Sequence, residues 1–148
     1  MIRFIYSGDI YDKDRESVAA HLTKCVSLVI ILPEDIEIEF RKLSESVYGE
    51  MVLDPRFPNR VRLAETLSVR EVLRPLVHEL IHLSQVHTGR LSIRRDGAYI
   101  WQGKPYAVNT QGMTYEEWSK LPWEQDVENT QNSVFKRAIE LGITMSCK

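Results

Sequence analysis

The sequence predicts an α+β protein. Three observations support this: short strand patterns and one helix pattern fill the first 65 residues, an amphipathic helix pattern occupies the middle of the chain, and another closes it. With 148 residues, 43% hydrophobic and 27% charged, the chain has an ordinary size and composition for one globular domain. It has no internal repeat and no Gly/Ser-rich linker. We therefore expect residues 1–148 to form a single domain.

The N-terminal part predicts a strand, a helix and a second strand. Residues 2–6 (IRFIY) are a short apolar run. Asp12 or Asp14 can cap a helix whose apolar residues recur at helical spacing and which ends before Pro33. In residues 36–41 apolar and charged residues alternate, which is typical of a strand with one face in water.

Two more strands are expected on either side of a turn. Residues 47–53 and 60–63 have strand patterns, and the segment between them (DPRFPN) is rich in turn-forming residues. The second of these strands, with its alternating arginines, is expected to lie at an edge of the sheet.

The middle of the chain predicts the best-defined helix. Ser68 and Glu71 have capping-box spacing, and Gly89 is a natural residue to end the helix. Pro75 lies inside this run, where it would kink the helix or delay its start. The apolar face comprises Val72, Leu76, Leu80, Leu83 and Val86.

A hairpin and a last helix complete the predicted fold. Residues 91–106 are expected to form the hairpin, with Asp96-Gly97 as its turn. The last helix is expected to begin near Pro122, which suits a first helical position, and to end at Gly142.

The composition argues against several classes of partner. A formal net charge of −2 with scattered Lys and Arg favours neither nucleic acid nor a membrane surface. The longest apolar stretch, residues 26–32, is too short to cross a bilayer, and the chain begins with a strand pattern instead of a signal peptide, so we expect a cytoplasmic protein. Cys25 and Cys147 are expected to be reduced thiols.

The residues that best indicate a function are His78-Glu79-Leu80-Ile81-His82, an HExxH motif within the middle helix. A spacing of four residues places both imidazoles on one helical face, where they can share one Zn²⁺ at about 2.0–2.1 Å. Glu79 is poorly placed to be a further ligand. It can instead take a proton from a zinc-activated water, as the general base.

A zinc site of this type needs a third protein ligand. The metzincin pattern requires glycine at position 85 and histidine at position 88, but the chain has Gln85 and Thr88 there, and His87 is out of register by one. We therefore expect His87 to be exposed near the helix end. The alternative is a carboxylate from the later helix, where residues 123–128 (WEQDVE) carry three acids.

Residues 78–85 (HELIHLSQ) resemble the zinc helix of small gluzincin-type peptidases. Residues 122–127 (PWEQDV) resemble the "P-x-E-x-E-A" segment that such families, including predicted metallopeptidases of tailed phages, place on their glutamate helix. The resemblance makes Glu124 the third ligand. Glu128, or Asp126, which departs from the usual glutamate, would then support a zinc-binding histidine through a hydrogen bond.

The resemblance also implies a zincin-like fold. In such a fold a small, mostly antiparallel sheet packs on the HExxH helix, and a C-terminal helix carries the glutamate. Strand addition of a substrate peptide at the sheet edge, here the 60–63 strand, is common in such proteins. A side chain that stabilises the oxyanion is expected nearby, and Tyr106 is the candidate among Tyr99, Tyr106, Tyr115, His87 and Arg90.

The predicted function is therefore zinc-dependent hydrolysis of a protein or peptide substrate, in the host cytoplasm if the protein is phage-encoded. Three alternatives remain open: a non-catalytic zinc-containing binding or assembly protein, a zinc amidase acting on a non-protein substrate, and a zinc-free domain that only mimics the motif. The sequence does not indicate an oligomeric state.

Overall fold

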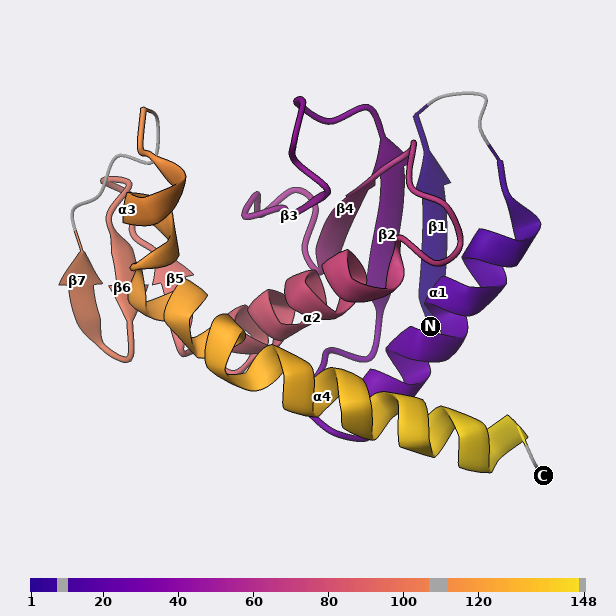
Figure 1. The fold of residues 1–148 in the computed structure, drawn as a ribbon. Helices are drawn as coiled ribbons and strands as arrows, with labels where there is room; N and C mark the ends of the chain where they lie inside the picture. Colours follow the sequence, from indigo (N-terminus) through magenta and orange to yellow (C-terminus); the bar gives the residue numbers. More distant parts are fainter. Residues whose placement is uncertain (8–10, 107–111, 147–148) are drawn as a thin grey trace.

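The computed structural model describes residues 1–7, 11–106 and 112–146. Figure 1 shows how its helices and strands are arranged. The strands are β1 (Ile2–Tyr6), β2 (Ile36–Arg41), β3 (Gly49–Met51), β4 (Arg60–Ala64), β5 (Leu91–Ile93), β6 (Tyr99–Trp101) and β7 (Lys104–Tyr106). The helices are α1 (Lys13–Val26), α2 (Leu73–His87), α3 (Tyr115–Ser119) and α4 (Pro122–Ser146). This content confirms the prediction of an α+β fold.

Four strands form the main sheet in the order β1-β2-β4-β3. Strand β2 pairs in parallel with both β1 and β4, and β3 pairs antiparallel with β4. The prediction that residues 60–63 form an edge was wrong. Strand β4 lies inside the sheet because the short strand β3 pairs along its outer side, with Gly49 opposite Leu63 and Met51 opposite Val61.

The second sheet is a three-stranded antiparallel meander, β5-β6-β7, where a single hairpin was expected. The expected turn at Asp96-Gly97 joins β5 to β6. A second tight turn at Gln102-Gly103, with φ of 49° and 82°, joins β6 to β7. Over both sheets, three of the five pairings between described strands are antiparallel, and both parallel pairings involve β2.

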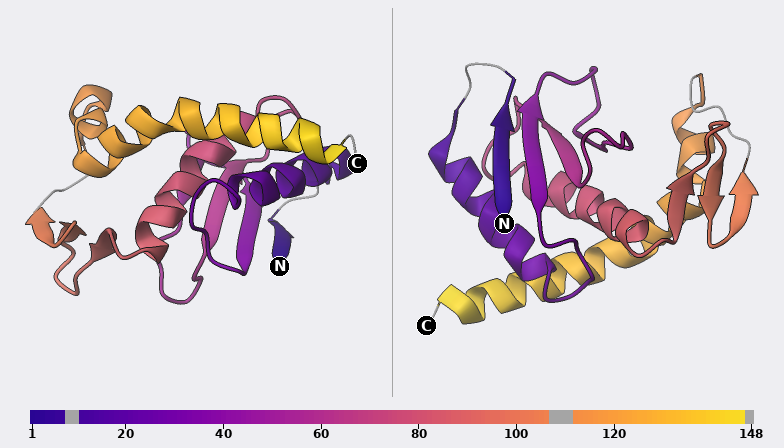
Figure 2. Two further views of the ribbon diagram at one scale, coloured as in Figure 1. Left: turned by 90° about the horizontal axis from the view of Figure 1, so that it is seen from below. Right: turned by 180° about the vertical axis from the view of Figure 1, so that it is seen from behind.

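Helices α1, α2 and α4 lie on one side of the main sheet, as both views in Figure 2 show. The apolar residues of the sheet alternate toward this side, and they are packed with the helices into one core. Its most deeply buried members include Ile38, Phe40, Val61, Leu63, Leu76, Leu80 and Val127. This core holds α2 against β3 and β4 and against α4.

The opposite face of the sheet carries paired charges. Arg60 and Arg62 of β4 form ion pairs with Glu37 and Glu39 of β2. Glu39 is only 5% exposed, although a wet face was expected there. It can be buried because Arg62 Nε and the Ser7 hydroxyl donate to its two oxygens at 2.8 and 2.7 Å.

The start of α2 agrees with the effect expected of Pro75. Ser68 and Glu71 form the reciprocal bonds of a capping box, but they belong to a preceding turn, and the helix begins at Leu73. Pro75 therefore lies in the first turn, where a missing amide hydrogen costs no helical bond. At the other end Gly89 adopts a φ of +80°, as the prediction of a helix end requires.

The end of α4 differs from the prediction. The helix continues through Gly142 to Ser146. A side chain at Gly142 would place its Cβ 3.3 Å from His21 Nε2 and 3.4 Å from Cys25 Sγ on α1. The glycine thus allows two helices to approach closely and does not end one. Cys25 is a free, buried thiol, and Cys147 lies outside the described residues.

A second, smaller core packs the three-stranded sheet against the start of α4. Its buried members are Leu91, Trp101, Leu121 and Trp123. Within the described ranges, no helix is both long and apolar enough to cross a membrane.

Candidate functional site

Helix α2 presents His78 and His82 on adjacent turns of one face, as the spacing predicts. Their ring centroids are 5.0 Å apart, and the planes are inclined by 73°. The side chain of His82 is 8% exposed and that of His78 is 21% exposed. The pair therefore lies at the edge of the core, where one imidazole is buried and the other faces a cavity.

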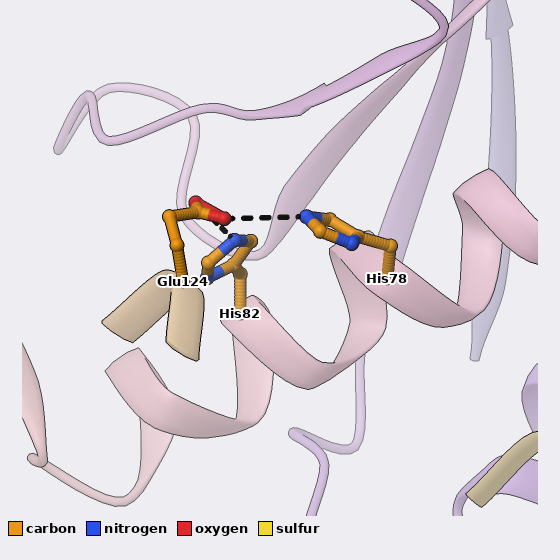
Figure 3. A group of neighbouring side chains, drawn as sticks. All are labelled: His78, His82 and Glu124. Carbon is orange, nitrogen blue, oxygen red and sulfur yellow. Dashed lines mark ion pairs between the residues drawn. The ribbon is translucent and has the colours of Figure 1, made fainter. Parts of the chain in front are cut away.

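Helix α4 brings Glu124 to the same two imidazoles (Figure 3). Glu124 Oε1 lies 2.7 Å from His82 Nε2, and Oε2 lies 3.5 Å from His78 Nε2. Each residue has one potential metal-binding atom that lies within 4.8 Å of the corresponding atoms of the other two. Glu124 lies in the first turn of α4, which begins at Pro122 and packs against α2.

These three residues can hold a metal ion. Glu124 Oε2 is buried and makes no hydrogen bond within the described residues. Its contact with His78 Nε2 at 3.5 Å is a long ion pair, and a buried carboxylate oxygen that no hydrogen bond satisfies would be compensated by a bound cation. Two imidazole nitrogens and one carboxylate oxygen form a donor set that suits Zn²⁺.

The three groups also perturb one another's ionisation. Burial acts to raise the pKa of Glu124 and to lower that of His78, but the contact between them outweighs burial. The pKa of the Glu124 carboxyl is held below its usual value, and that of His78 is raised to about 9. The ionised Glu124 carboxylate therefore favours a positive charge at the two imidazoles, from protons or from another cation.

Two glutamines contact the histidines at Nδ1, the ring nitrogens that do not face Glu124. Gln131 Oε1 lies 2.9 Å from His78 Nδ1, and Gln85 Oε1 lies 2.8 Å from His82 Nδ1. An amide oxygen only accepts, so each Nδ1 donates to its glutamine; a protonated Nε2 faces Glu124, and when the imidazole becomes neutral it is Nε2 that carries the lone pair. This is the tautomer that a metal ion bound at Nε2 requires.

Gln85 also joins the two helices. Its Nε2 donates to the Trp123 carbonyl and to Asp126 Oδ2, each at 2.9 Å. Arg90 donates to the same Asp126 oxygen at 3.2 Å. The Gln85 side chain is completely buried, so its contacts with His82 and the Trp123 carbonyl are shielded from water, whereas the Asp126–Arg90 pair is partly exposed.

The acids expected to support the histidines are placed differently. Asp126 reaches His82 only through Gln85. Glu128 lines a cavity and, within the described part of the chain, has no hydrogen bond to either imidazole. Sequence reasoning missed Gln85 and Gln131. Their spacing could have indicated them. Gln85 is three residues after His82 and Gln131 is seven residues after Glu124, so each lies on the same helical face as the ligand before it.

Glu79 lies beside this cluster without belonging to it. It is 6% exposed, and burial raises the pKa of its carboxyl to about 7. Strand β3 passes directly over it: a Cβ at Gly49 would lie 3.1 Å from Glu79 Cγ and 3.3 Å from the Arg62 carbonyl oxygen. A side chain at position 49 would therefore require Glu79, Leu63 or the backbone at Arg62 to move by a few tenths of an ångström.

Two cavities open beside Glu79 and Glu124, which line both. The larger, of about 760 Å³, lies on the His78 side and is bordered by polar residues such as Arg74, Glu128 and Gln131. The smaller, of about 390 Å³, lies on the His82 side. Both volumes fall in the range of roughly 300–1,000 Å³ that is usual for ligand pockets.

The aromatic candidates are distributed over both sides of the site. Tyr106 makes an edge contact with the Trp123 ring at 5.8 Å and lines neither of these two cavities. Tyr115 lines the larger cavity and Tyr99 the smaller. His87 is exposed in the last turn of α2. The geometry thus gives Tyr106 a packing contact and no path to the site.

Comparison with protein-family models, with curated proteins and with solved structures finds no match for this chain. The site is therefore interpreted from its own residues.

Proposed function

We propose that the protein is a zinc-dependent peptidase with a zincin-like site, in which His78, His82 and Glu124 hold Zn²⁺ and Glu79 is the general base. The observation that carries this proposal is the convergence of two imidazoles and one carboxylate, whose buried Oε2 makes no hydrogen bond within the described residues, next to the separate carboxyl of Glu79, which lines two cavities. The resemblance to small gluzincin-type peptidases, including those of tailed phages, belongs to the same proposal.

Zinc suits this donor set better than Mg²⁺ or Ca²⁺, which prefer oxygen ligands alone. Three protein ligands leave one tetrahedral position open, as in catalytic zinc sites, whereas structural sites usually have four. Bound there, zinc would supply Lewis-acid chemistry, increasing the acidity of water and polarising a carbonyl group.

Glu79 provides the proton transfer. Its carboxylate takes a proton from the attacking water as the new C–O bond forms, and it then delivers a proton to the nitrogen as the C–N bond breaks. In the metal-free site burial raises the pKa of this carboxyl to about 7, and a group with a pKa near neutral can both accept and release a proton.

A peptide is the substrate favoured by the position of β3. This strand ends the sheet order, so the side of it that faces away from β4 can pair with an added strand. It also crosses Glu79, so a peptide added there would bring its backbone to the general base.

The test combines metal content with one substitution. Purified protein should contain about one zinc per chain, and Glu79→Gln should keep that zinc while hydrolysis of a mixed peptide library falls by about 10²–10⁴-fold. Glu116→Gln is the matched control, because Glu116 is an exposed acid on α3 that lines neither cavity. It should retain full activity.

Each contrary result favours a different alternative. Zinc that is retained without hydrolysis of any peptide by the wild-type protein would favour a non-catalytic binding or assembly protein. Hydrolysis of non-peptide amides alone would favour an amidase. If the protein does not bind zinc even after reconstitution, the proposed function is wrong.

A further inference from the structure

We infer that the larger cavity binds a lysine or arginine side chain of the substrate, through the Glu128 carboxylate and the aromatic rings of Tyr115 and Trp118. This inference rests on the proposed function, because the cavity opens onto the same metal-binding residues. It names what the proposal leaves open, the charge of the residue that the enzyme selects.

The larger cavity has an acidic lining. Three carboxyl groups border it, those of Glu79, Glu124 and Glu128. Among the described residues that line it, Arg74 is the one arginine or lysine. The Arg74 guanidinium contacts Asn132 Oδ1 at 3.3 Å and lies 4.8 Å from the centre of the Phe135 ring, and neither of these two residues lines the cavity. The positive charge of Arg74 is therefore directed toward residues outside the cavity.

Glu128 is the acid of this cavity that has no part in the proposed metal chemistry. Glu124, Glu128 and Gln131 are spaced four and three residues apart, so they share one face of α4. His78 contacts the first and the last of them, Glu124 Oε2 at 3.5 Å and Gln131 Oε1 at 2.9 Å. Glu128 therefore lies on the face of α4 that meets His78, and within the described residues no hydrogen bond or ion pair engages its carboxylate. Glu79 and Glu124 would balance the charge of a bound Zn²⁺, which leaves Glu128 to pair with a charge on the substrate.

Aromatic rings form another part of the cavity wall. Tyr48, Tyr115 and Trp118 line it. The ring centres of Tyr115 and Trp118 lie 5.9 Å apart, and the Trp118 ring is nearly parallel to that of His78, with 6.4 Å between their centres. Tyr115 is 79% exposed, so its ring is accessible to a ligand. The face of an aromatic ring attracts an ammonium or guanidinium group, so these rings and the Glu128 carboxylate favour the same kind of ligand.

The cavity has the size and the position for a substrate side chain. Its volume of about 760 Å³ accommodates a lysine or arginine side chain together with neighbouring backbone. Because His78, Glu79 and Glu124 also line it, the bound side chain belongs to a residue close to the reacting carbonyl group. An acidic side chain is disfavoured there by repulsion from Glu128, and an uncharged one gains no ion pair.

Binding of zinc-chelating probes tests this inference without requiring turnover. Each probe carries a hydroxamate and either lysine or norleucine, which has a side chain of similar length without the charge. One pair is the hydroxamates of N-acetyllysine and N-acetylnorleucine. The other pair joins malonic acid monohydroxamate to lysinamide or norleucinamide, so that the two pairs place the side chain on opposite sides of the chelating group. In at least one pair, titrated into zinc-loaded protein by calorimetry, the lysine probe should bind about 5- to 30-fold more tightly.

The substitution Glu128→Gln removes the charge and keeps the size of the side chain, and it should reduce this ratio to about threefold or less. Tyr115→Ala removes one ring and should lower the ratio about two- to fivefold. Glu116→Gln is the matched control, because Glu116 is an exposed acid on the same short helix as Tyr115 and lines neither cavity. It should leave the ratio unchanged, which excludes a general effect of the net charge.

The outcomes separate this inference from the proposed function. Equal binding of lysine and norleucine in both pairs of probes, or a preference for lysine that survives Glu128→Gln, would overturn the assignment of the cavity and leave the zinc site intact. Absence of zinc, or of any hydroxamate binding, would overturn both.

Discussion

Replacing Gln85 by leucine tests whether the hydrogen bonds of Gln85, and not merely the space that its side chain fills, support the metal ligand His82. Leucine is similar in bulk but removes the acceptor of His82 Nδ1 and the donor to the Trp123 carbonyl and to Asp126. Asp126 keeps its contact with Arg90 and the Trp123 carbonyl keeps its bond within helix α4, so His82 Nδ1 is the buried group left unpaired. The loss of its partner costs about 1–3 kcal/mol, so the free energy of unfolding of the zinc-free protein should fall by roughly that amount.

Zinc affinity should fall as well, because His82 is no longer held in the tautomer that leaves Nε2 free. Loss of such a partner typically weakens metal binding by about 10–100-fold. Urea unfolding of chelator-treated protein measures the first effect, and competition with a chromogenic chelator measures the second. Gln125→Leu is the control, because Gln125 is an exposed glutamine that contacts the Ser119 carbonyl and neither histidine.

The variant Gln85→Glu distinguishes the two effects. A carboxylate can still accept from His82 Nδ1, but it cannot donate to the Trp123 carbonyl and it repels Asp126. Zinc affinity should therefore recover relative to Gln85→Leu while stability does not. If Gln85→Leu binds zinc within about twofold of the wild type, the proposed orienting role is refuted.

Three further predictions follow from the same geometry. Glu124→Ala should lose most of the bound zinc, as measured by metal analysis, whereas Asp126→Ala should lose much less; the reverse order would place the third ligand elsewhere. The melting temperature of zinc-free protein should fall from pH 6 to pH 9.5, and a constant or rising value would contradict this. The pKa values of His78 and Glu79 are raised to about 9 and about 7 in the folded state, so the protonated forms stabilise it, and this stabilisation is lost as the pH rises through those values. Gly49→Ala should reduce the free energy of unfolding by about 1–3 kcal/mol in urea titrations, because its Cβ would crowd Glu79 and backbone; an unchanged midpoint would show that β3 can shift.

The parts of the site that are close in sequence were predicted from spacing alone. His78 and His82 share a face of one helix because a helix repeats every 3.6 residues, and this needs no knowledge of the fold. Glu124 lies 42 residues beyond His82, so spacing could only nominate it among nearby acids, and the resemblance was needed to select it. Gln85 and Gln131 were overlooked because a glutamine is ordinarily a surface residue.

The sheet was harder to predict than the helices. The boundaries of β1 and β2 were predicted because their apolar residues run or alternate clearly, but β3 has only three residues and includes a glycine. Nothing in its composition indicates that it would cover β4. Gly142 was misread for a related reason: the sequence shows a glycine at the end of an apolar pattern, but only the approach of α1 explains it.

The first two turns of α4 connect two cores. Trp123 is buried in the smaller core, whereas Val127, one turn later, is buried in the main one, and Glu124 lies between them. Small packed units open at lower free energy than whole domains unfold. Local opening of the smaller core would therefore withdraw Glu124 from the histidines while the main sheet stays folded. The time for which Glu124 stays beside the histidines would then depend on the four buried side chains of the smaller core. Bound metal would in turn slow hydrogen exchange at the start of α4.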